Sequence, residues 1–406
     1  MSVPHLIMPS SPTARSPASV RLLTLAAYVS FVPVGVATVL LGPMLPILSA
    51  RWSLNYAQAG ALFPVQYVAS TVAVALSGVL VSRFGFRFAI QTGLLLVAVG
   101  LGLLMAGPRW LAVICIAAYG AGNGVAVPAA NLMVAELNPG RRSATLNWLN
   151  FCWSTGAVAC PFLVAAAAKA HHVPIFLIAV AALSLVIAVL FTFAPAVEPR
   201  AIARAVGGTV AVIRRKLWPF LMLAALFLVY VGTENGFGFW VASFAKSLGS
   251  LTATMALMTP SFFYATLMLG RMLAPFLLRS FSDIKLAQAG LILSCAGMAG
   301  MIFSQQLPGV VASASAAGLG LSAVYPITIS ILSKDFAGSS SRIGSFMFVL
   351  SNVGGGLFPW IVGVTSDGFG TLKAGLFVPL LGCALMYVLY LQRWDQLSPA
   401  GSELSS

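Results

Sequence analysis

The sequence predicts an all-α integral membrane protein with twelve transmembrane helices in two six-helix halves that repeat one another. Hydrophobic residues make up 60% of the 406 residues, and only 7% are charged, whereas soluble domains carry about 25% charge. Mean hydropathy is +0.98, and apolar runs of about 20 residues, the length that crosses a bilayer, recur along the chain. These values exclude soluble, fibrous and disordered classes.

Apolar runs and the turn residues between them define the elements in order. A Pro- and Ser-rich stretch, 1–19, is predicted to be a disordered cytoplasmic tail. The N-terminal half, 20–194, contains six predicted spans: 20–49, 56–82, 87–107, 110–135, 143–168 and 173–194. A cation-rich cytoplasmic linker follows at 195–216. The C-terminal half, 217–392, contains spans 217–242, 254–279, 284–304, 308–333, 343–366 and 373–391, followed by a cytoplasmic tail at 393–406.

The distribution of Lys and Arg predicts the orientation, because cytoplasmic loops of membrane proteins are enriched in both. With both termini in the cytoplasm, sixteen of the 22 cations face inward, five face outward and Arg271 lies inside a span. The net charge of +14 is explained by this bias, so we expect no nucleic-acid partner. The predicted location is a bacterial inner or plasma membrane.

The two halves resemble each other at an offset of about 196 to 200 residues. Gly122 and Gly124 precede Pro128, Glu136, Arg142 and Pro161, as Gly318 and Gly320 precede Pro326, Asp335, Arg342 and Pro359. Repeated six-span halves are typical of secondary transporters that move around a site at mid-membrane. The pattern therefore predicts alternating access by a monomer.

The loop after the second span carries a further motif, Gly78-Val-Leu-Val-Ser82-Arg83-Phe-Gly85-Phe-Arg87. With twelve spans, a central linker and a repeat, the chain resembles the major facilitator superfamily. That family has Gly, three residues, Asp, a cation, one residue and Gly at this loop. Ser82 replaces the Asp, so the charge latch that the resemblance implies for Arg83 lacks its carboxylate.

A narrower resemblance is to the fucose permease-like branch, which includes sugar–proton symporters. It rests on short stretches: Pro46 to Gly60, Pro128 to Asn131, Leu146 to Gly156, Tyr230 to Trp240, Gly270-Arg271, Gly318 to Pro326 and Asn352 to Pro359. The resemblance implies a monosaccharide as substrate. The branch carries acids in its first and fourth spans, where this chain has Gly42 and Val127. This chain therefore lacks both acids of the family's proton route.

Glu234 is the acid that lies deep in a predicted span, and Arg271 is the cation that does so. A charge at this depth is expensive and indicates function by default. Glu234 is our candidate for proton coupling or for a bond to a substrate hydroxyl; a structural bond is the alternative. Arg271 lies about eight residues, or ~12 Å, from the inner end of its span, and Glu234 about 18 residues from that side. Their depths differ, so no ion pair is predicted.

Amides and aromatic rings within spans form the rest of the predicted substrate site, because a sugar needs donors, acceptors and a ring face. The candidates besides Glu234 are Gln66, Asn131, Asn150, Trp153, Asn235, Trp240, Tyr325 and Asn352. Asn150 and Trp153 lie three residues apart and share a helix face. Trp240 would cap the cavity or anchor the membrane interface. For each of these residues the alternative is packing between helices.

Charged residues at equivalent inner loops are candidate latches between the halves. We expect gating roles for Arg83, for Glu136 with Arg142, for Asp335 with Arg342, and for Arg271 near the inner surface. For the loop residues the alternative is a solvated charge. For Arg271 the alternatives are packing and a contact with the substrate.

An enzyme is not predicted, because no clustered carboxylates or HExxH motif accompany the spans, and no Walker lysine is present. We expect no metal and no cofactor; the coupling ion is a proton if there is one, and sodium stays open. The predicted function is transport of a small polar solute, a monosaccharide first, through the lipid bilayer. The alternative is export of amphipathic drugs, metabolites or lipid-like compounds.

Overall fold

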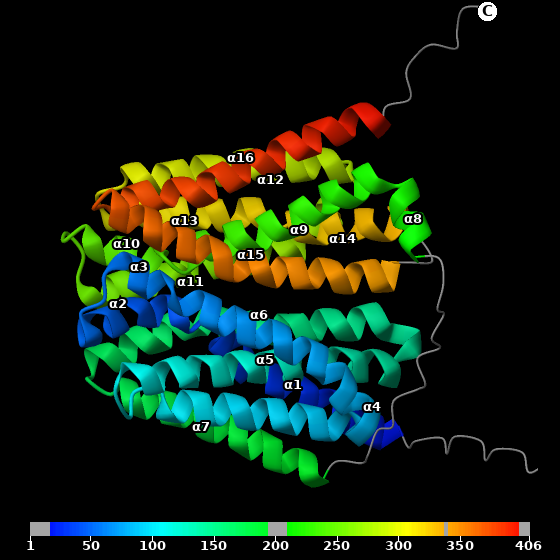
Figure 1. The fold of residues 1–406 in the computed structure, drawn as a ribbon, viewed down its shortest axis with the longest axis horizontal. Coiled ribbons are helices and arrows are strands. Elements are labelled where there is room, and N and C mark those ends of the chain that lie inside the picture. The colour runs from blue at the N-terminus through cyan, green and yellow to red at the C-terminus, as the bar shows by residue number, and fades with distance from the viewer. Residues whose placement is uncertain (1–16, 194–208, 337–339, 398–406) are drawn as a thin grey trace, which may run out of the picture.

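The computed structural model describes residues 17–193, 209–336 and 340–397, and every regular element within these ranges is a helix. The N-terminal half comprises α1 (Pro17–Val39), α2 (Leu41–Trp52), α3 (Tyr56–Gly60), α4 (Leu62–Leu103), α5 (Arg109–Leu137), η1 (Pro139–Arg141), α6 (Arg142–Lys169), α7 (Val173–Leu190) and η2 (Phe191–Phe193). These elements form the blue-to-green bundle in the lower part of Figure 1.

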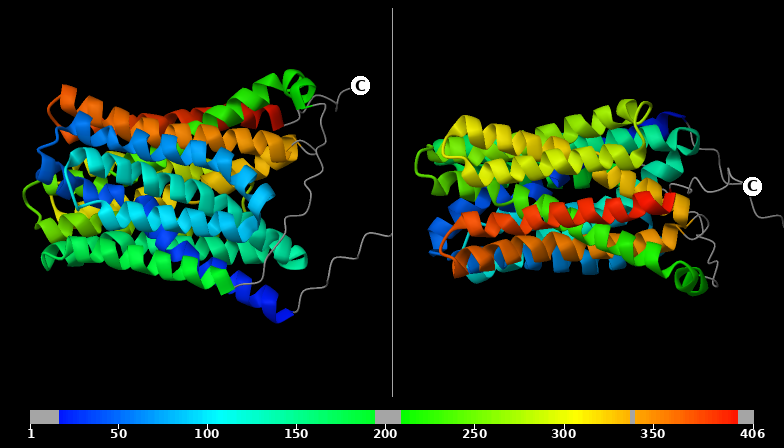
Figure 2. Two further views of the ribbon diagram at one scale, coloured as in Figure 1. Left: turned by 60° about the horizontal axis from the view of Figure 1, so that its bottom comes forward. Right: turned by 90° about the horizontal axis from the view of Figure 1, so that it is seen from above.

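The C-terminal half forms the second bundle, which runs from green to red in the upper part of Figure 1. It comprises α8 (Thr209–Arg215), α9 (Leu217–Gly238), α10 (Val241–Ser247), α11 (Ala253–Leu277), α12 (Asp283–Phe303), α13 (Leu307–Leu321), α14 (Val324–Asp335), α15 (Ser340–Gly368) and α16 (Leu372–Leu397). The start of α1 and the end of α16 lie at the same end of the molecule in every view (Figures 1 and 2). We call this end the terminal side and the other the opposite side.

The predicted twelve-span fold is confirmed. The described residues contain 11 helices that are long and apolar enough to cross a membrane. One of them, Tyr56–Leu103, has 48 residues, or ~72 Å of helix, which is more than twice the ~30 Å of a bilayer core. Gly85 interrupts it with φ 82° and ψ 169°. This conformation favours glycine, and it reverses the chain between the second and third spans.

Three spans are broken near their middle or toward one end. The first is divided at Leu40 between α1 and α2, the seventh at Phe239 and Trp240 between α9 and α10, and the tenth at Ser322 and Ala323 between α13 and α14. The last carbonyls of a helix lack intrahelical partners. The breaks therefore place unpaired backbone groups inside the bundle, where side chains from other helices bind them.

The two halves pack tightly on the opposite side. Phe63 of α4 stacks on Phe239 with ring centroids 5.0 Å apart and planes 4° apart. A Cβ built on Gly363 of α15 would lie 3.0 Å from Gly60 Cα and 2.5 Å from the Tyr56 carbonyl oxygen, so only glycine fits there. Lys246 Nζ of α10 donates to the Pro46 carbonyl at 3.4 Å. The contact between the halves is mostly apolar, and at Gly363 and Gly60 the two backbones touch directly.

The halves diverge toward the terminal side, as one face of α6 shows. Asn147 and Asn150 are exposed, whereas Ser154, Ala157 and Pro161, further along the same face, are buried. At the buried level α6 meets α11 of the other half, where Ser261 Oγ donates to the Val158 carbonyl at 2.9 Å. The same helix face thus changes from closed contact to open space, so the interface between the halves opens on the terminal side.

Candidate functional site

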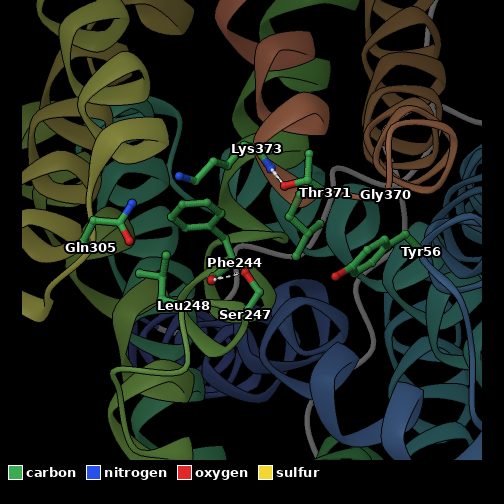
Figure 3. A pocket seen from close by; sticks show the side chains of 9 residues that line it. Tyr56, Phe244, Ser247, Leu248, Gln305, Gly370, Thr371 and Lys373 are labelled. Atoms are coloured by element: carbon green, nitrogen blue, oxygen red, sulfur yellow. Dashed lines mark hydrogen bonds between the residues drawn. The ribbon is translucent and has the colours of Figure 1, made fainter.

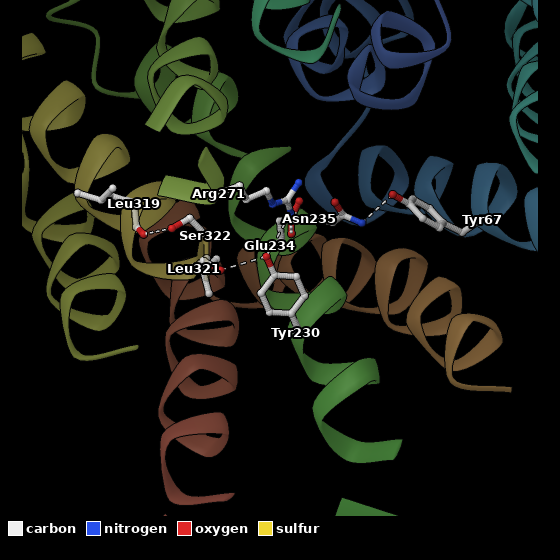
Figure 4. Close-up of polar contacts among 8 residues, drawn as sticks. All are labelled: Tyr67, Tyr230, Glu234, Asn235, Arg271, Leu319, Leu321 and Ser322. Atoms are coloured by element: carbon white, nitrogen blue, oxygen red, sulfur yellow. Dashed lines mark hydrogen bonds and ion pairs between the residues drawn. The ribbon is translucent and has the colours of Figure 1, made fainter. Parts of the chain in front are cut away.

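An ion pair joins Arg271, in the last third of α11, to Glu234, in the last turns of α9. Arg271 Nη2 lies 3.3 Å from Glu234 Oε2 and donates to Tyr230 Oη at 3.4 Å. Tyr230 Oη donates to the Leu321 carbonyl at 3.2 Å, one of the groups left unpaired by the break between α13 and α14. The Arg271 side chain is 28% exposed and that of Glu234 11%. Figure 4 shows these side chains converging.

The ion pair corrects our estimate that the depths of Glu234 and Arg271 keep them apart. In a helix, side chains lean toward the N-terminus. Because α9 starts on the terminal side and α11 on the opposite side, Glu234 leans toward the terminal side and Arg271 leans the other way. The two long side chains therefore meet between their backbones. The gating role predicted for Arg271 stays a prediction.

Tyr325 of α14, a predicted site residue, completes the C-terminal cluster. Its ring stacks on that of Tyr230 with centroids 5.1 Å apart and planes 29° apart, and it is half-buried. The stacked rings and the ion pair form one surface, which combines an aromatic face with charged hydrogen-bonding groups.

A hydrogen bond between the halves lies next to this surface. Asn235 Nδ2 donates to Tyr67 Oη of α4 at 2.6 Å (Figure 4). A Cβ on Gly355 of α15 would lie 2.6 Å from Tyr67 Cε1 and 2.9 Å from Asn235 Nδ2. Only glycine admits this pair. The predicted residue Asn352 lies one turn earlier on α15 and is half-buried.

The N-terminal half contributes a cluster of uncharged polar groups around Thr38 of α1. Thr38 Oγ1 accepts from Asn123 Nδ2 of α5 and from Trp153 Nε1 of α6, each at 3.3 Å. The Thr38 carbonyl accepts from Gln66 Nε2 of α4 at 3.1 Å. Four helices are tied together at this point, and the predicted residues Gln66 and Trp153 belong to the same cluster.

Three other predicted substrate residues, Asn131, Asn150 and Trp240, use their N–H groups for bonds outside these clusters. Asn131 Nδ2 donates to the Val127 carbonyl at 2.8 Å and Asn150 Nδ2 to the Leu146 carbonyl at 2.9 Å, each on its own helix. Trp240 is only 1% exposed, and its Nε1 donates to the Pro359 carbonyl at 2.9 Å. Trp240 is thus part of the closed contact on the opposite side, and its role as a cap of the cavity stays a prediction.

The predicted latch residues lie on the terminal side. Arg83 and Arg142 are exposed, and Glu136 is half-buried. The Asp335 carbonyl accepts from Lys216 Nζ at 2.6 Å. Arg342 lies in the first turn of α15, but its side chain lies outside the described part of the chain. These predicted roles stay predictions.

An ion pair that we did not predict joins Lys334 of α14 to Asp283 of α12 at 2.8 Å. The Lys334 side chain is 67% exposed and that of Asp283 31%. Exposed pairs contribute little to stability. We therefore expect Lys334→Met to lower the free energy of unfolding by less than about 1 kcal/mol, measured by SDS denaturation in mixed micelles. A larger loss would mean that this pair is a structural latch.

A pocket of about 280 Å³ opens on the opposite side, between Tyr56 of α3 and the ends of α10, α12 and α16. Figure 3 shows Lys373, Gln305 and Ser247 around it. None of the predicted site residues lines it. Among the described residues no three His, Cys, Asp or Glu side chains form a group that could bind a metal ion.

Comparison with known proteins assigns the family. The sequence model of the Major Facilitator Superfamily matches residues 27–359. The chain belongs to this superfamily. It is therefore a transporter and not an enzyme, and an integral multi-pass membrane protein. No curated protein matches the sequence.

Solved structures of transporters share the fold. A bacterial homologue of the human lysosomal transporter Spinster, in an inward-facing and unoccupied conformation, has a TM-score of 0.78 at 14% identity, covering 95% of this chain and 100% of that one. The D-xylose–proton symporter has a TM-score of 0.74 at 17% identity, covering 92% and 97%. The Escherichia coli fucose:proton symporter has a TM-score of 0.63 at 20% identity, covering 92% and 99%. At these identities the likeness shows the fold alone.

Sequence reasoning missed the residues that organise the two clusters. Thr38 bonds to three side chains of its cluster, and Tyr230 bonds to Arg271 and to the Leu321 carbonyl. Neither residue was a candidate. Tyr67 and Asn123 also lie within spans and were not selected. A usable signal existed for Tyr230, which lies four residues before Glu234 on the same helix face. Thr38 offers no such signal, because a threonine in a span bonds to its own helix by default, as Thr38 Oγ1 does to the Val34 carbonyl at 2.8 Å.

Proposed function

We propose that this transporter carries a small, neutral, polar solute, a monosaccharide first, by alternating access. The observation that carries the proposal is the charge balance of the site. Glu234 and Arg271 compensate each other at 3.3 Å, and the groups around Thr38 are uncharged. A site of this kind has no uncompensated charge to attract a cation or an anion. It offers amide and hydroxyl groups instead.

The aromatic rings support the same substrate class. Trp153 in the N-terminal half and Tyr325 in the C-terminal half are both half-buried, so part of each ring surface is accessible. A sugar presents C–H groups on its ring faces and hydroxyls around its edge. Such a solute uses an aromatic face and polar groups together, which a simple hydrophobic cation does not.

We propose that Glu234 is the coupling group if transport is coupled to protons. Protonation of Glu234 removes its charge and weakens its bond to Arg271. The guanidinium, which keeps its bond to Tyr230, then becomes available to a substrate hydroxyl. Sodium coupling stays a second option. In this scheme Arg271 takes part in binding, and its predicted gating role is indirect.

We further propose that both termini are cytoplasmic, as the distribution of cations predicts. The terminal side is then the cytoplasmic side of a bacterial inner membrane. The state described here is then open to the cytoplasm and closed to the outside by Phe63, Phe239 and Trp240. We also propose the division into two halves at 20–194 and 217–392. We also propose that a single chain is the transporting unit.

The test is a thermal-shift panel on detergent-purified protein. It compares monosaccharides at tens of millimolar with lipophilic cations and fatty amphiphiles. A ligand present at 100 times its Kd stabilises the native state by about 2.7 kcal/mol. We expect one or two sugars to raise the midpoint while their stereoisomers do not. A shift with lipophilic compounds alone would contradict the proposal and support export of amphipathic compounds.

A further inference from the structure

Three buried side-chain polar atoms have no hydrogen-bond partner in the described part of the chain, and two of them, one in each half, lie in helices that form the site. These two are Asn123 Oδ1 of α5 and Tyr264 Oη of α11. Asn123 is 7% exposed and Tyr264 3%. A buried polar atom without a partner destabilises the folded state, and nearly all such atoms in proteins are paired. These two atoms therefore indicate a group that binds them in another stage of the cycle.

Asn123 lies at the middle of α5, in the cluster around Thr38. Its Nδ2 donates to Thr38 Oγ1 at 3.3 Å, and Trp153 Nε1 donates to the same oxygen. This bond fixes the orientation of the amide. The oxygen Oδ1 is left as an acceptor, and it needs a donor such as a hydroxyl.

Tyr264 lies nearer than the ion pair to the closed contact on the opposite side. It precedes Arg271 by seven residues, which is two turns of α11, so both side chains lie on one face of that helix. A Cβ on Gly238, one turn after Glu234 on α9, would lie 2.9 Å from Tyr264 Oη. Ser261, one turn earlier on α11, bonds across to α6 of the other half. The hydroxyl thus packs against α9, and Tyr264 lies one turn from a hydrogen bond that joins the two halves.

A third unpartnered atom, Thr233 Oγ1, provides a comparison. Thr233 is fully buried, and a Cβ on Gly382 of α16 would lie 2.3 Å from its hydroxyl. Its hydroxyl therefore faces α16 within the C-terminal half and not the N-terminal half. It shares burial and lack of a partner with the other two, but not their location.

We propose that Asn123 Oδ1 and Tyr264 Oη are substrate contacts, one from each half, which bind two different hydroxyl groups of the same solute. This inference rests on the proposed function and deepens it. The amide oxygen accepts from one hydroxyl, and the phenol donates to or accepts from another. The preferred solute is thus neutral and carries hydroxyls on separate parts of a ring. A solute that bridges the halves in this way favours their closure around it.

The experiment measures KM for uptake into proteoliposomes, with the monosaccharide found by the panel and its series of monodeoxy analogues. Tyr264→Phe removes only the hydroxyl, Asn123→Leu removes the acceptor, and Thr233→Val is the control. We expect Tyr264→Phe and Asn123→Leu each to raise KM roughly five- to tenfold, the effect of one neutral hydrogen bond. Each variant should stop discriminating against one deoxy analogue, and the two analogues should differ. Thr233→Val should keep the wild-type KM.

Unchanged KM and deoxy profiles in both variants, with sugar uptake by the wild type intact, would overturn this inference and leave the proposed function standing. Equal shifts in Thr233→Val would also overturn it, because a general effect of buried hydroxyls would then explain the result. If Asn123→Leu fails to fold, Asn123→Ser shortens the side chain and withdraws the amide acceptor. It should stop discriminating against one deoxy analogue, and a wild-type profile in this variant would overturn the inference. Absence of any sugar uptake by the wild type would refute the proposed function and this inference together.

Discussion

Arg271→Met is expected to abolish uptake, with at least a 100-fold lower initial rate in proteoliposomes, and to destabilise the protein. The substitution leaves Glu234, whose side chain is 11% exposed, without its partner. Removing one member of a buried ion pair costs about 3–5 kcal/mol. We expect about 3 kcal/mol, the lower end of that range, because the Arg271 side chain is 28% exposed. SDS denaturation in mixed micelles measures the change.

The control for this prediction is the double variant Glu234→Gln with Arg271→Gln. It removes both charges. When both members of a buried ion pair are replaced together, the free energy of unfolding often changes little. We expect most of the lost stability to return while uptake stays absent. Wild-type uptake and stability in Arg271→Met would show that the pair is neither structural nor functional.

Gly363→Val is expected to hold the transporter open on the opposite side and to stop uptake. A Cβ at this position would lie 2.5 Å from the Tyr56 carbonyl oxygen and 3.0 Å from Gly60 Cα, and neither backbone atom can move without moving its helix. Overpacking of this kind costs about 1–3 kcal/mol. At about 3 kcal/mol the ratio of two conformations changes roughly 150-fold. Electron spin resonance between labels at positions 171 and 306, one on an opposite-side loop of each half, measures the change as a longer distance.

The matched control is Gly368→Val on the same helix, where nothing lies within 4 Å of the added Cβ. This variant should keep the short distance between the labels and the wild-type uptake rate. An unchanged distance in Gly363→Val would contradict the account of the closed contact. An equal increase in Gly368→Val would mean that α15 responds to any added side chain.

The fold was predictable because the bilayer constrains it strongly. A backbone in lipid must satisfy its own hydrogen bonds, so each long apolar run becomes a helix. The reversal at Gly85 was predictable from the loop motif around Arg83. The breaks within the first, seventh and tenth spans were not predicted. They occur inside apolar runs, where no polar boundary marks them.

The site was predictable in composition more than in geometry. Glu234, Tyr325, Gln66 and Trp153 were candidates, and the structure places them in two clusters, one in each half. Which side chains meet depends on helix tilt and on the direction in which side chains lean, as the ion pair of Glu234 with Arg271 shows. The bond from Asn235 to Tyr67 further requires a glycine on a third helix, Gly355. Spacing along one helix contains none of this information.

Counterflow of a labelled monosaccharide in proteoliposomes tests the central claim most directly, because exchange across the membrane needs alternating access but no ion gradient. Vesicles are loaded with the unlabelled sugar that gives the largest thermal shift, and wild type is compared with Glu234→Gln. We predict that the wild type accumulates label transiently. We predict that Glu234→Gln folds but either no longer exchanges the sugar or exchanges it at a rate that does not depend on pH. No exchange of any stabilising sugar by the wild type, or wild-type exchange and pH dependence in Glu234→Gln, would contradict the account.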